Sequence, residues 1–181
     1  PEIGCYGTPI KTPHLDNLAA RGTLFRNAYV PQAGCSQSRA AFLTGLYPHQ
    51  NGQIGLATWK YRMYSGKIPN VVKTLGKAGY RTGIIGKLHI NPESAFPFDF
   101  KAIPKANFSR KNMTAYVENA KRFFLQSDAP FYLQVNYPDA HRPFIKTIDR
   151  LPAKPLTGKD VDAIAYMGIN HSELKQQTAD Y

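Results

Sequence analysis

The stretch from Asn70 to Ile90, "NVVKTLGKAGYRTGIIGKLHI", contains a helix signal followed directly by a strand signal. Asn70 is a preferred N-cap residue and Gly79 a helix stop, and the apolar residues between them fall on one helical face. The segment 81–90, "RTGIIGKLHI", has an apolar run that is typical of a buried strand. This stretch therefore predicts an αβ step.

The same alternation extends in both directions along the chain. "KTPHLDNLAARG" predicts a short amphipathic helix, with Thr12 as N-cap, Pro13 in its first turn, and Leu15, Leu18 and Ala19 on one face. Further helices are predicted at 36–44, 114–128 and from 171 to the chain end, and strands at 23–30 and 131–137. Alternating helices and strands predict an α/β fold with a mostly parallel sheet flanked by helices. Residues 47–69, dense in Gly, Asn, Pro and aromatic residues, predict a long surface loop.

Composition limits the classes of protein to consider. With 181 residues and 43% hydrophobic content, one compact core is expected. No apolar run is long enough for a membrane span. The formal net charge of +11 favours anionic partners, but the chain has no nucleic-acid-binding motif, so no nucleic acid partner is expected. The two cysteines, Cys5 and Cys35, allow at most one disulfide and leave the redox compartment open.

The segment "GCSQSRAAFLTG", 34–45, places Cys35 at a helix start and Arg39 one turn later on the same face. Lys87 and His89 are two residues apart near the predicted end of a strand, so both are expected on one side of it. Each residue also has a structural interpretation. Cys35 could be a packed thiol, Lys87 a solvated side chain and His89 a buried, hydrogen-bonded histidine.

Five ordered segments between Ile3 and about Phe144 together resemble the sulfatase family. "CSQSRAAFLTG" is similar to the family signature, with matches at Cys35, Ser38, Arg39 and the Leu-Thr-Gly that follows. "GCYGTPIKTPHLDNLAARGTLFRNAY", "LYPHQNGQIG", "LGKAGYRTGIIGKLHI" and "APFYLQVNYPDAHRPF" resemble the family's other segments. "HQNG", "TGIIGKLHINPES" and "FPFDF" look most like the sulfamidases, the heparan N-sulfatases.

This resemblance implies an alkaline-phosphatase-like domain and a hydrolase that releases sulfate from a sulfated sugar of the glycosaminoglycan type. Cys35 would be converted to formylglycine by a formylglycine-generating enzyme, and the aldehyde hydrate would attack sulfur. Arg39 would hold the hydrate, and Lys87 and His89 would contact the hydrate and the sulfate. His141 would bind sulfate or protonate the leaving group, and Arg142 would contact substrate. By themselves, His141 and Arg142 could equally be surface residues.

The resemblance also implies a calcium ion, held by Cys35 after modification, by two consecutive aspartates at the end of the first strand and by an Asp-Asn pair late in the domain. This sequence lacks both pairs at those places. Residues 1–181 are therefore interpreted as an incomplete N-terminal portion of a sulfatase catalytic domain, without its first strand and C-terminal part, and as inactive alone. Gln37 and Ala140 replace residues typical of the family, which puts modification of Cys35 in question and loosens the loop before His141. A periplasmic, lysosomal or secreted location follows only from the family.

Two alternatives to a sulfatase stay open. A non-catalytic module with the same fold could bind sulfated glycans or other anions through Arg39, Lys87 and His141. A phosphohydrolase of the wider superfamily is disfavoured by Cys35, because that group uses Ser or Thr as its nucleophile. The aromatic residues of the long loop, Trp59, Tyr61 and Tyr64, could stack on a sugar or cover the core. Surface or capping roles are expected for the remaining polar candidates, His14, Asp16, His49, Glu93 and Asp99.

Overall fold

The computed structural model describes residues 3–8, 10–104, 113–138, 141–148, 150–162 and 168–180. The α-helices are α1 (Pro13–Arg21), α2 (Cys35–Thr44), α3 (Pro48–Asn51), α4 (Val71–Lys77), α5 (Met113–Leu125) and α6 (Ser172–Asp180). The strands are β1 (Arg81–Gly86), β2 (Phe100–Ala102) and β3 (Phe131–Asn136). Single 3-10 turns lie at η1 (Gly4–Tyr6), η2 (Ala57–Trp59) and η3 (Glu93–Ala95).

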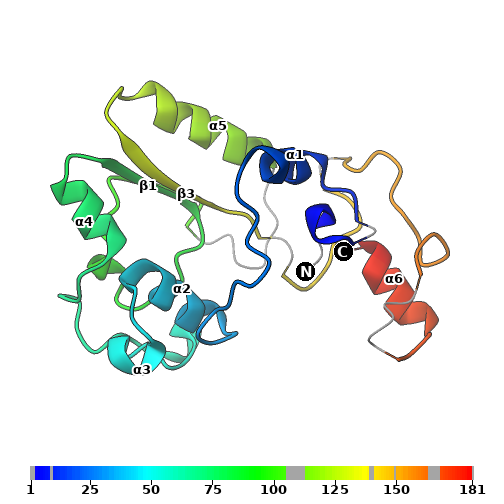
Figure 1. Ribbon diagram of the computed structural model, residues 1–181, viewed down its shortest axis with the longest axis horizontal. Coiled ribbons are helices and arrows are strands. Elements are labelled where there is room, and N and C mark those ends of the chain that lie inside the picture. Colours follow the sequence, from blue (N-terminus) through cyan, green and yellow to red (C-terminus); the bar gives the residue numbers. More distant parts are fainter. Residues whose placement is uncertain are drawn as a thin grey trace.

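The strands form a parallel sheet in the order β2-β1-β3, in which Gly83 of β1 is level with Phe100 and with Leu133. Helix α5 follows one side of this sheet, whereas α2, α3 and α4 lie on the other (Figure 1). Helix α6 lies at the opposite end of the molecule from α4 (Figure 1). The parallel pairing and the helices on both faces confirm the predicted α/β fold.

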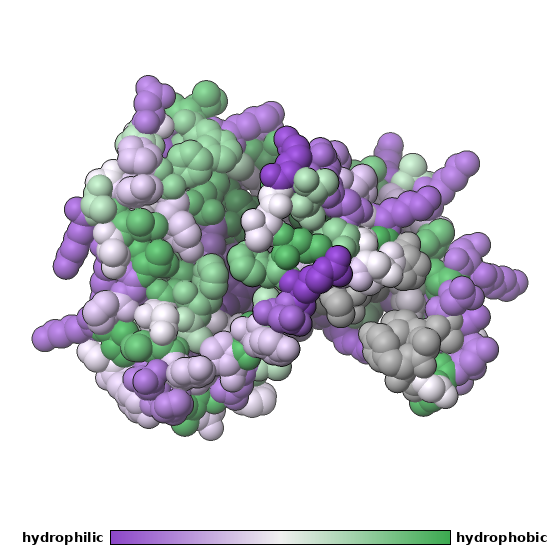
Figure 2. Space-filling view, viewed as in Figure 1, coloured by the Kyte–Doolittle hydropathy of each residue, from purple (hydrophilic) through white to green (hydrophobic). Residues whose placement is uncertain are grey.

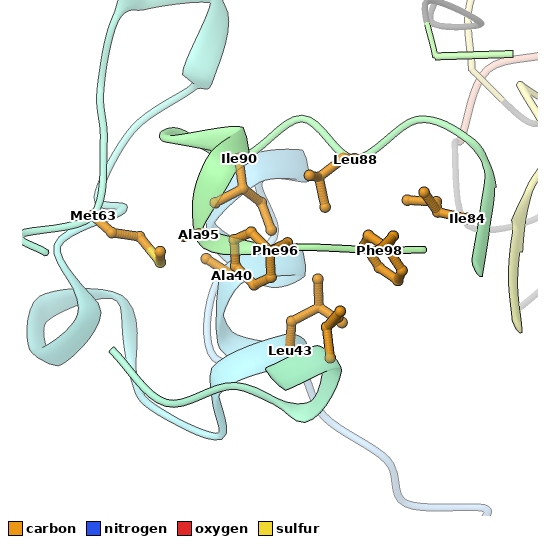
Figure 3. Close-up of a cluster of buried hydrophobic side chains, with 10 residues drawn as sticks. Ala40, Leu43, Met63, Ile84, Leu88, Ile90, Ala95, Phe96 and Phe98 are labelled. Carbon is orange, nitrogen blue, oxygen red and sulfur yellow. The ribbon is translucent and has the colours of Figure 1, made fainter. Parts of the chain in front are cut away.

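Neighbouring residues of β1 are buried in different cores. Ile84 belongs to a cluster that α2, α4 and the segment after β1 complete, with Leu43, Ile90 and Phe96 among its members (Figure 3). Ile85 belongs to a second cluster on the α5 side, with Tyr116 and Phe123. A strand covered on both faces needs apolar residues without alternation, which explains the run in the sequence.

The predicted αβ step is confirmed, with its helix at 71–77. The Asn70 side chain accepts a hydrogen bond from Lys73 N at 3.2 Å, as an N-cap does. The strand is shorter than predicted and ends at Gly86, which has a φ of 95°. A Cβ added at Gly86 would lie 2.2 Å from the carbonyl oxygen of Asn136, so only glycine allows β1 and β3 to approach so closely here.

Three predictions need correction. Residues 23–30 form no strand, and Phe25, Tyr29 and Val30 in this segment are exposed, because neither edge of the sheet pairs with them. Helix α1 has the predicted bounds, but Leu15 and Leu18 on its apolar face are exposed. The loop 47–69 is not a simple surface excursion, because it contains α3 and η2 and its inner residues, such as Gln53 and Met63, are buried.

Among the described residues, no helix combines the length and the apolar character that crossing a membrane would require. The visible face of the molecule mixes hydrophilic and hydrophobic residues, and hydrophobic ones extend over the part formed by α2 to α5 (Figure 2). Two exposed apolar side chains of this part are Phe42 in α2 and Phe124 in α5.

Candidate active site

Helix α2 positions Cys35 at its first residue. Gly34 is the N-cap in an extended conformation, and its carbonyl oxygen accepts from Ser38 N at 2.9 Å. The next side chain, Ser36, is fully buried and accepts a hydrogen bond from Ala57 N at 2.9 Å. The helix start that carries the half-buried Cys35 is thus fixed to η2.

Arg39 joins α2 to the segment that follows β1. Its Nη1 donates to the carbonyl oxygen of Lys87 at 2.8 Å, and Asn136 Nδ2 at the end of β3 donates to the same oxygen at 3.0 Å. Burial lowers the pKa of the Arg39 guanidinium, and the neighbouring Cys35 opposes this shift. One carbonyl oxygen therefore brings α2, β1 and β3 together where the strands end.

The Lys87 side chain lies against Cys35 and is buried. Burial lowers the pKa of its ammonium group, and repulsion from Arg39 acts in the same direction. Attraction to Cys35 and a side-chain hydrogen bond with it act in the opposite direction. Two basic groups therefore face the side chain at position 35.

His89 has a φ of 58°, so it lies beyond the strand in the left-handed region. Its Nε2 is 3.3 Å from Thr58 Oγ1, and its Nδ1 is buried with no hydrogen-bond partner among the described residues. Burial, and then the charges of Lys87, Arg39 and His141, lower its pKa to about 4. The imidazole is therefore neutral near pH 7 and can accept a proton.

His141 is exposed and its Nδ1 lies 2.6 Å from the carbonyl oxygen of Arg142. Because it contributes to lowering the pKa of His89, it lies on the same side of the molecule as the other candidates. The guanidinium of Arg142 lies over the ring of Phe144, 5.1 Å from its centroid. Ala140, the residue before His141, lies outside the described residues.

The structure thus brings Cys35, Arg39, Lys87, His89 and His141 into one region, and Lys87 and His89 reach it by another geometry than expected. The expected strand spacing of Lys87 and His89 is wrong, because the strand ends before both of them. Residues that the sequence analysis did not single out hold the arrangement: Ser36, Asn136 and Thr58. Of these, Asn136 could have been found, because a polar residue at the carboxyl end of a parallel strand faces the usual ligand-binding edge.

An open cavity of about 780 Å³ adjoins Cys35. Ser38, Arg39 and Asn136 give it a polar side. Residues from three parts of the chain form the apolar side. They are Tyr29 and Val30 before α2, Phe42 in α2 and Tyr47 after it. This volume is within the range of small-molecule sites.

A calcium ion needs hard oxygen ligands. In the part of the chain that the structure describes, no group of three His, Cys, Asp or Glu side chains could hold a metal. Asp99 is already bound to Thr82 N and Oγ1, at 2.8 and 2.9 Å. The basic and imidazole groups around Cys35 do not make a calcium site by themselves, so no step below is assigned to a metal.

Gln37, two residues after Cys35, is buried with its side chain against Gly34. Its Nε2 donates to the carbonyl oxygen of Ile54 at 3.3 Å. A Cβ added at Gly34 would lie 2.4 Å from Gln37 Oε1, so the absence of a side chain at Gly34 leaves room for the Gln37 amide. Gln37 therefore supports the loop after α3 rather than extending into solvent.

The comparisons with known proteins agree with the resemblance in the sequence. The family model described as Sulfatase matches residues 1–181. Human N-sulphoglucosamine sulphohydrolase is 45% identical over 148 residues, which are 78% of this chain and 29% of that protein. Human arylsulfatase A is 43% identical over 103 residues, 52% of this chain and 20% of that protein. The chain thus spans less than a third of the length of these relatives.

Solved structures give the same result. A protein in complex with its substrate D-glucosamine-2-N,6-O-disulfate superposes with a TM-score of 0.67 at 25% identity, over 80% of this chain and 33% of its own. A 2-O GAG sulfatase gives a TM-score of 0.60 at 25% identity, over 77% of this chain and 32% of its own. The three-stranded sheet and its helices therefore match sulfatase structures over part of their length.

Proposed function

Because this chain belongs to the sulfatase family, we propose that it is part of a hydrolase that releases sulfate from a sulfated sugar of the glycosaminoglycan type. The sulfate is bound to oxygen or to nitrogen in that substrate. The observation that carries this proposal is the group of basic and imidazole side chains around Cys35: Arg39, Lys87, His89 and His141. A sulfate is an anion, and buried positive charge without competing carboxylates is what such a site requires.

In this proposal a formylglycine-generating enzyme oxidises Cys35 before catalysis, with an external oxidant, so that the thiol sulfur is lost and a carbonyl oxygen is gained. The hydrate of the resulting formylglycine supplies an oxygen nucleophile. One hydroxyl oxygen bonds to sulfur, the bond from sulfur to the sugar oxygen or nitrogen breaks, and the leaving atom takes up a proton. The second hydroxyl then loses its proton, the bond from the formylglycine carbon to the sulfate oxygen breaks, and sulfate leaves as the aldehyde forms again. Addition of water to the aldehyde restores the hydrate. No oxidant or reductant is needed in either step, so the modified residue is regenerated.

The residues have distinct parts in this sequence of steps. Arg39 and Lys87 stabilise the negative charge on the hydrate and on the sulfate oxygens. His89, neutral because of its lowered pKa, accepts the proton that the hydrate releases. Both remaining residues lie in the segment after β3. His141 provides the proton for the leaving group, and Arg142 contacts the substrate. The complete protein, rather than residues 1–181, is proposed to supply the calcium ligands, the activity and the location outside the cytosol.

The first experiment is the mass of the tryptic peptide "NAYVPQAGCSQSR", 27–39, from protein made in its native host. Replacement of sulfur by a carbonyl oxygen supports the modification of Cys35. Sulfate release by the complete protein from glucosamine N-sulfate and from an O-sulfated sugar then tests the reaction and separates the two leaving atoms. An intact thiol together with no sulfate release would contradict the proposal.

Arg39→Ala should lower kcat/KM for sulfate release about 100- to 1000-fold, because a charge that stabilises the reacting groups is lost. The matched control is Arg21→Ala, since Arg21 is an exposed arginine at the end of α1 that bonds only to Asn17 O within the described residues. Equal effects of the two substitutions would remove Arg39 from the mechanism.

A non-catalytic anion-binding module is the second candidate. Gln37 favours it, because this residue replaces the one typical of the family signature and puts conversion of Cys35 in question. Gln37 is buried and hydrogen-bonded, so the packing around the helix start accommodates the replacement. Heparin binding that weakens with salt, without turnover and with an unmodified Cys35, would support this alternative.

A further inference from the structure

We propose that the segment Ala57–Lys67 is a second subsite, which binds the sugar next to the one that loses its sulfate. This inference rests on the proposed function and makes it more specific, because it predicts an anionic oligosaccharide as the substrate rather than a free monosaccharide. Three independent features of the segment support it: its position, its fixed backbone and its exposed side chains.

The segment borders the candidate site directly. Thr58 Oγ1 lies 3.3 Å from His89 Nε2, and Ala57 N donates to Ser36 Oγ at 2.9 Å, one residue from Cys35. A sugar whose sulfate faces Cys35 would therefore have its neighbour in the chain within reach of η2 and the residues after it.

Buried polar groups hold the backbone of this segment. Gln53, fully buried, donates through Nε2 to Tyr61 O at 3.1 Å and accepts from Asn91 N at 3.1 Å. Asn91 Nδ2 donates to the carbonyl oxygens of Ala57 and Tyr61, at 2.9 and 3.0 Å, and Met63 N donates to Asn91 O at 2.8 Å. A backbone fixed in this way loses little conformational freedom when a ligand binds.

The aromatic residues of the segment differ in what they pack against. A Cβ added at Gly55 would lie 2.3 Å from the ring of Tyr61, and one added at Gly52 would lie within 2.7 Å of the ring of Tyr64, so both tyrosines cover glycines. Trp59 is 71% exposed, about as much as Tyr64 at 72%, but unlike Tyr64 it covers no such glycine. A large indole held in water on a fixed turn offers an apolar face to the C–H face of a sugar ring.

The charges around Trp59 fit an anionic sugar. Lys60, Arg62 and Lys67 are exposed and alternate with the aromatic residues, and no ion pair involves them in the described part of the chain. The whole interval 17–92 holds ten Lys and Arg residues and no Asp or Glu, although the full chain has 12 acidic residues. Most of the basic surplus therefore lies in the stretch of chain that carries the candidate site, and its members beside Trp59, the exposed Lys60, Arg62 and Lys67, can attract sulfate and carboxylate groups.

The test compares a monosaccharide with an oligosaccharide in the complete protein. Binding of glucosamine N-sulfate and of a heparin-derived tetrasaccharide is measured in a Cys35→Ala background, which prevents turnover. Trp59→Ala should weaken tetrasaccharide binding relative to monosaccharide binding about three- to tenfold, and Trp59→Phe should recover much of this loss. The double substitution Lys60→Ala, Arg62→Ala should weaken tetrasaccharide binding further and reduce its salt dependence. The matched control Lys77→Ala, Lys101→Ala removes the same charge at exposed sites outside the segment and should do neither.

Three results would overturn the inference. The first is an unchanged ratio of tetrasaccharide to monosaccharide binding in Trp59→Ala. The second is an equal effect of the two double substitutions, which would reduce the segment to general charge. The third is equally tight, Trp59-dependent binding of a single-stranded oligonucleotide of similar charge, which would assign the segment to nucleic acid. Because these are binding measurements, they are independent of whether sulfate is released, which tests the proposed function.

Discussion

Helices α1 and α2 have similar lengths and similar stop signals, yet they have opposite environments. Helix α1, the more clearly amphipathic in sequence, has no buried residue. Helix α2 buries Ser36, Gln37, Ala40, Ala41 and Leu43. The comparison shows that capping residues and periodicity predict where a helix forms, whereas burial depends on what the rest of the chain places against it.

The partners of the two helices explain the difference. Helix α2 packs between α3, α4 and the segment after β1, and Ala40 and Leu43 both belong to the core cluster there (Figure 3). Helix α1 contacts mainly η1. Because Cys35 and Arg39 are on α2, the candidate site belongs to the well-packed part of the molecule, which favours a fixed geometry.

The largest test of this contrast is one substitution made in both helices. Leu43 is 2% exposed and Leu18 is 62% exposed. Leu43→Ala should lower the free energy of unfolding by about 2–5 kcal/mol, because it removes buried methyl groups and leaves a cavity. Leu18→Ala should cost less than about 1 kcal/mol. Urea unfolding measures both, and equal losses would show that α1 is packed as closely as α2.

The sequence predicted most of the elements that pack against each other. Asn70 and the apolar run after Gly79 predicted α4 and β1 because their signals are local. The strand predicted at 23–30 is absent, and β2, only three residues long, was not predicted. Both errors have one cause: a strand needs a partner, and the choice of partner is not local.

The candidate site shows the same limit. The spacing of Cys35 and Arg39 on one helix was enough to place them together. Lys87 and His89 were grouped by resemblance, and the strand geometry invoked for them is wrong. What places them at the site is the hydrogen bond from Arg39 to Lys87 O and the left-handed backbone at His89, and neither has a sequence signal of its own.

A second, smaller effect is expected from the polar groups that fix the loop beside α2. Gln53→Leu leaves the carbonyl oxygens of Gly55 and Tyr61 and the amide of Asn91 without this partner, so it should cost about 2–3 kcal/mol of unfolding free energy. Gln32→Leu, at an exposed glutamine between α1 and α2, should stay within about 0.5 kcal/mol. Equal urea midpoints would mean that the loop is not held by Gln53.

The smallest effect, because solvent screens a partly buried imidazole, is a pH dependence that belongs to His89. Its pKa in the folded chain is about 4, below its ordinary value of 6.5. Between these values the unfolded chain binds a proton that the folded chain does not, so stability falls as pH drops from about 6.5 to about 4 and is level above that window. His89→Gln should flatten this slope in urea unfolding, whereas His14→Gln on the exposed face of α1 should leave it unchanged. A slope that survives in His89→Gln would assign the proton to another group and remove the physical basis for treating His89 as a neutral proton acceptor.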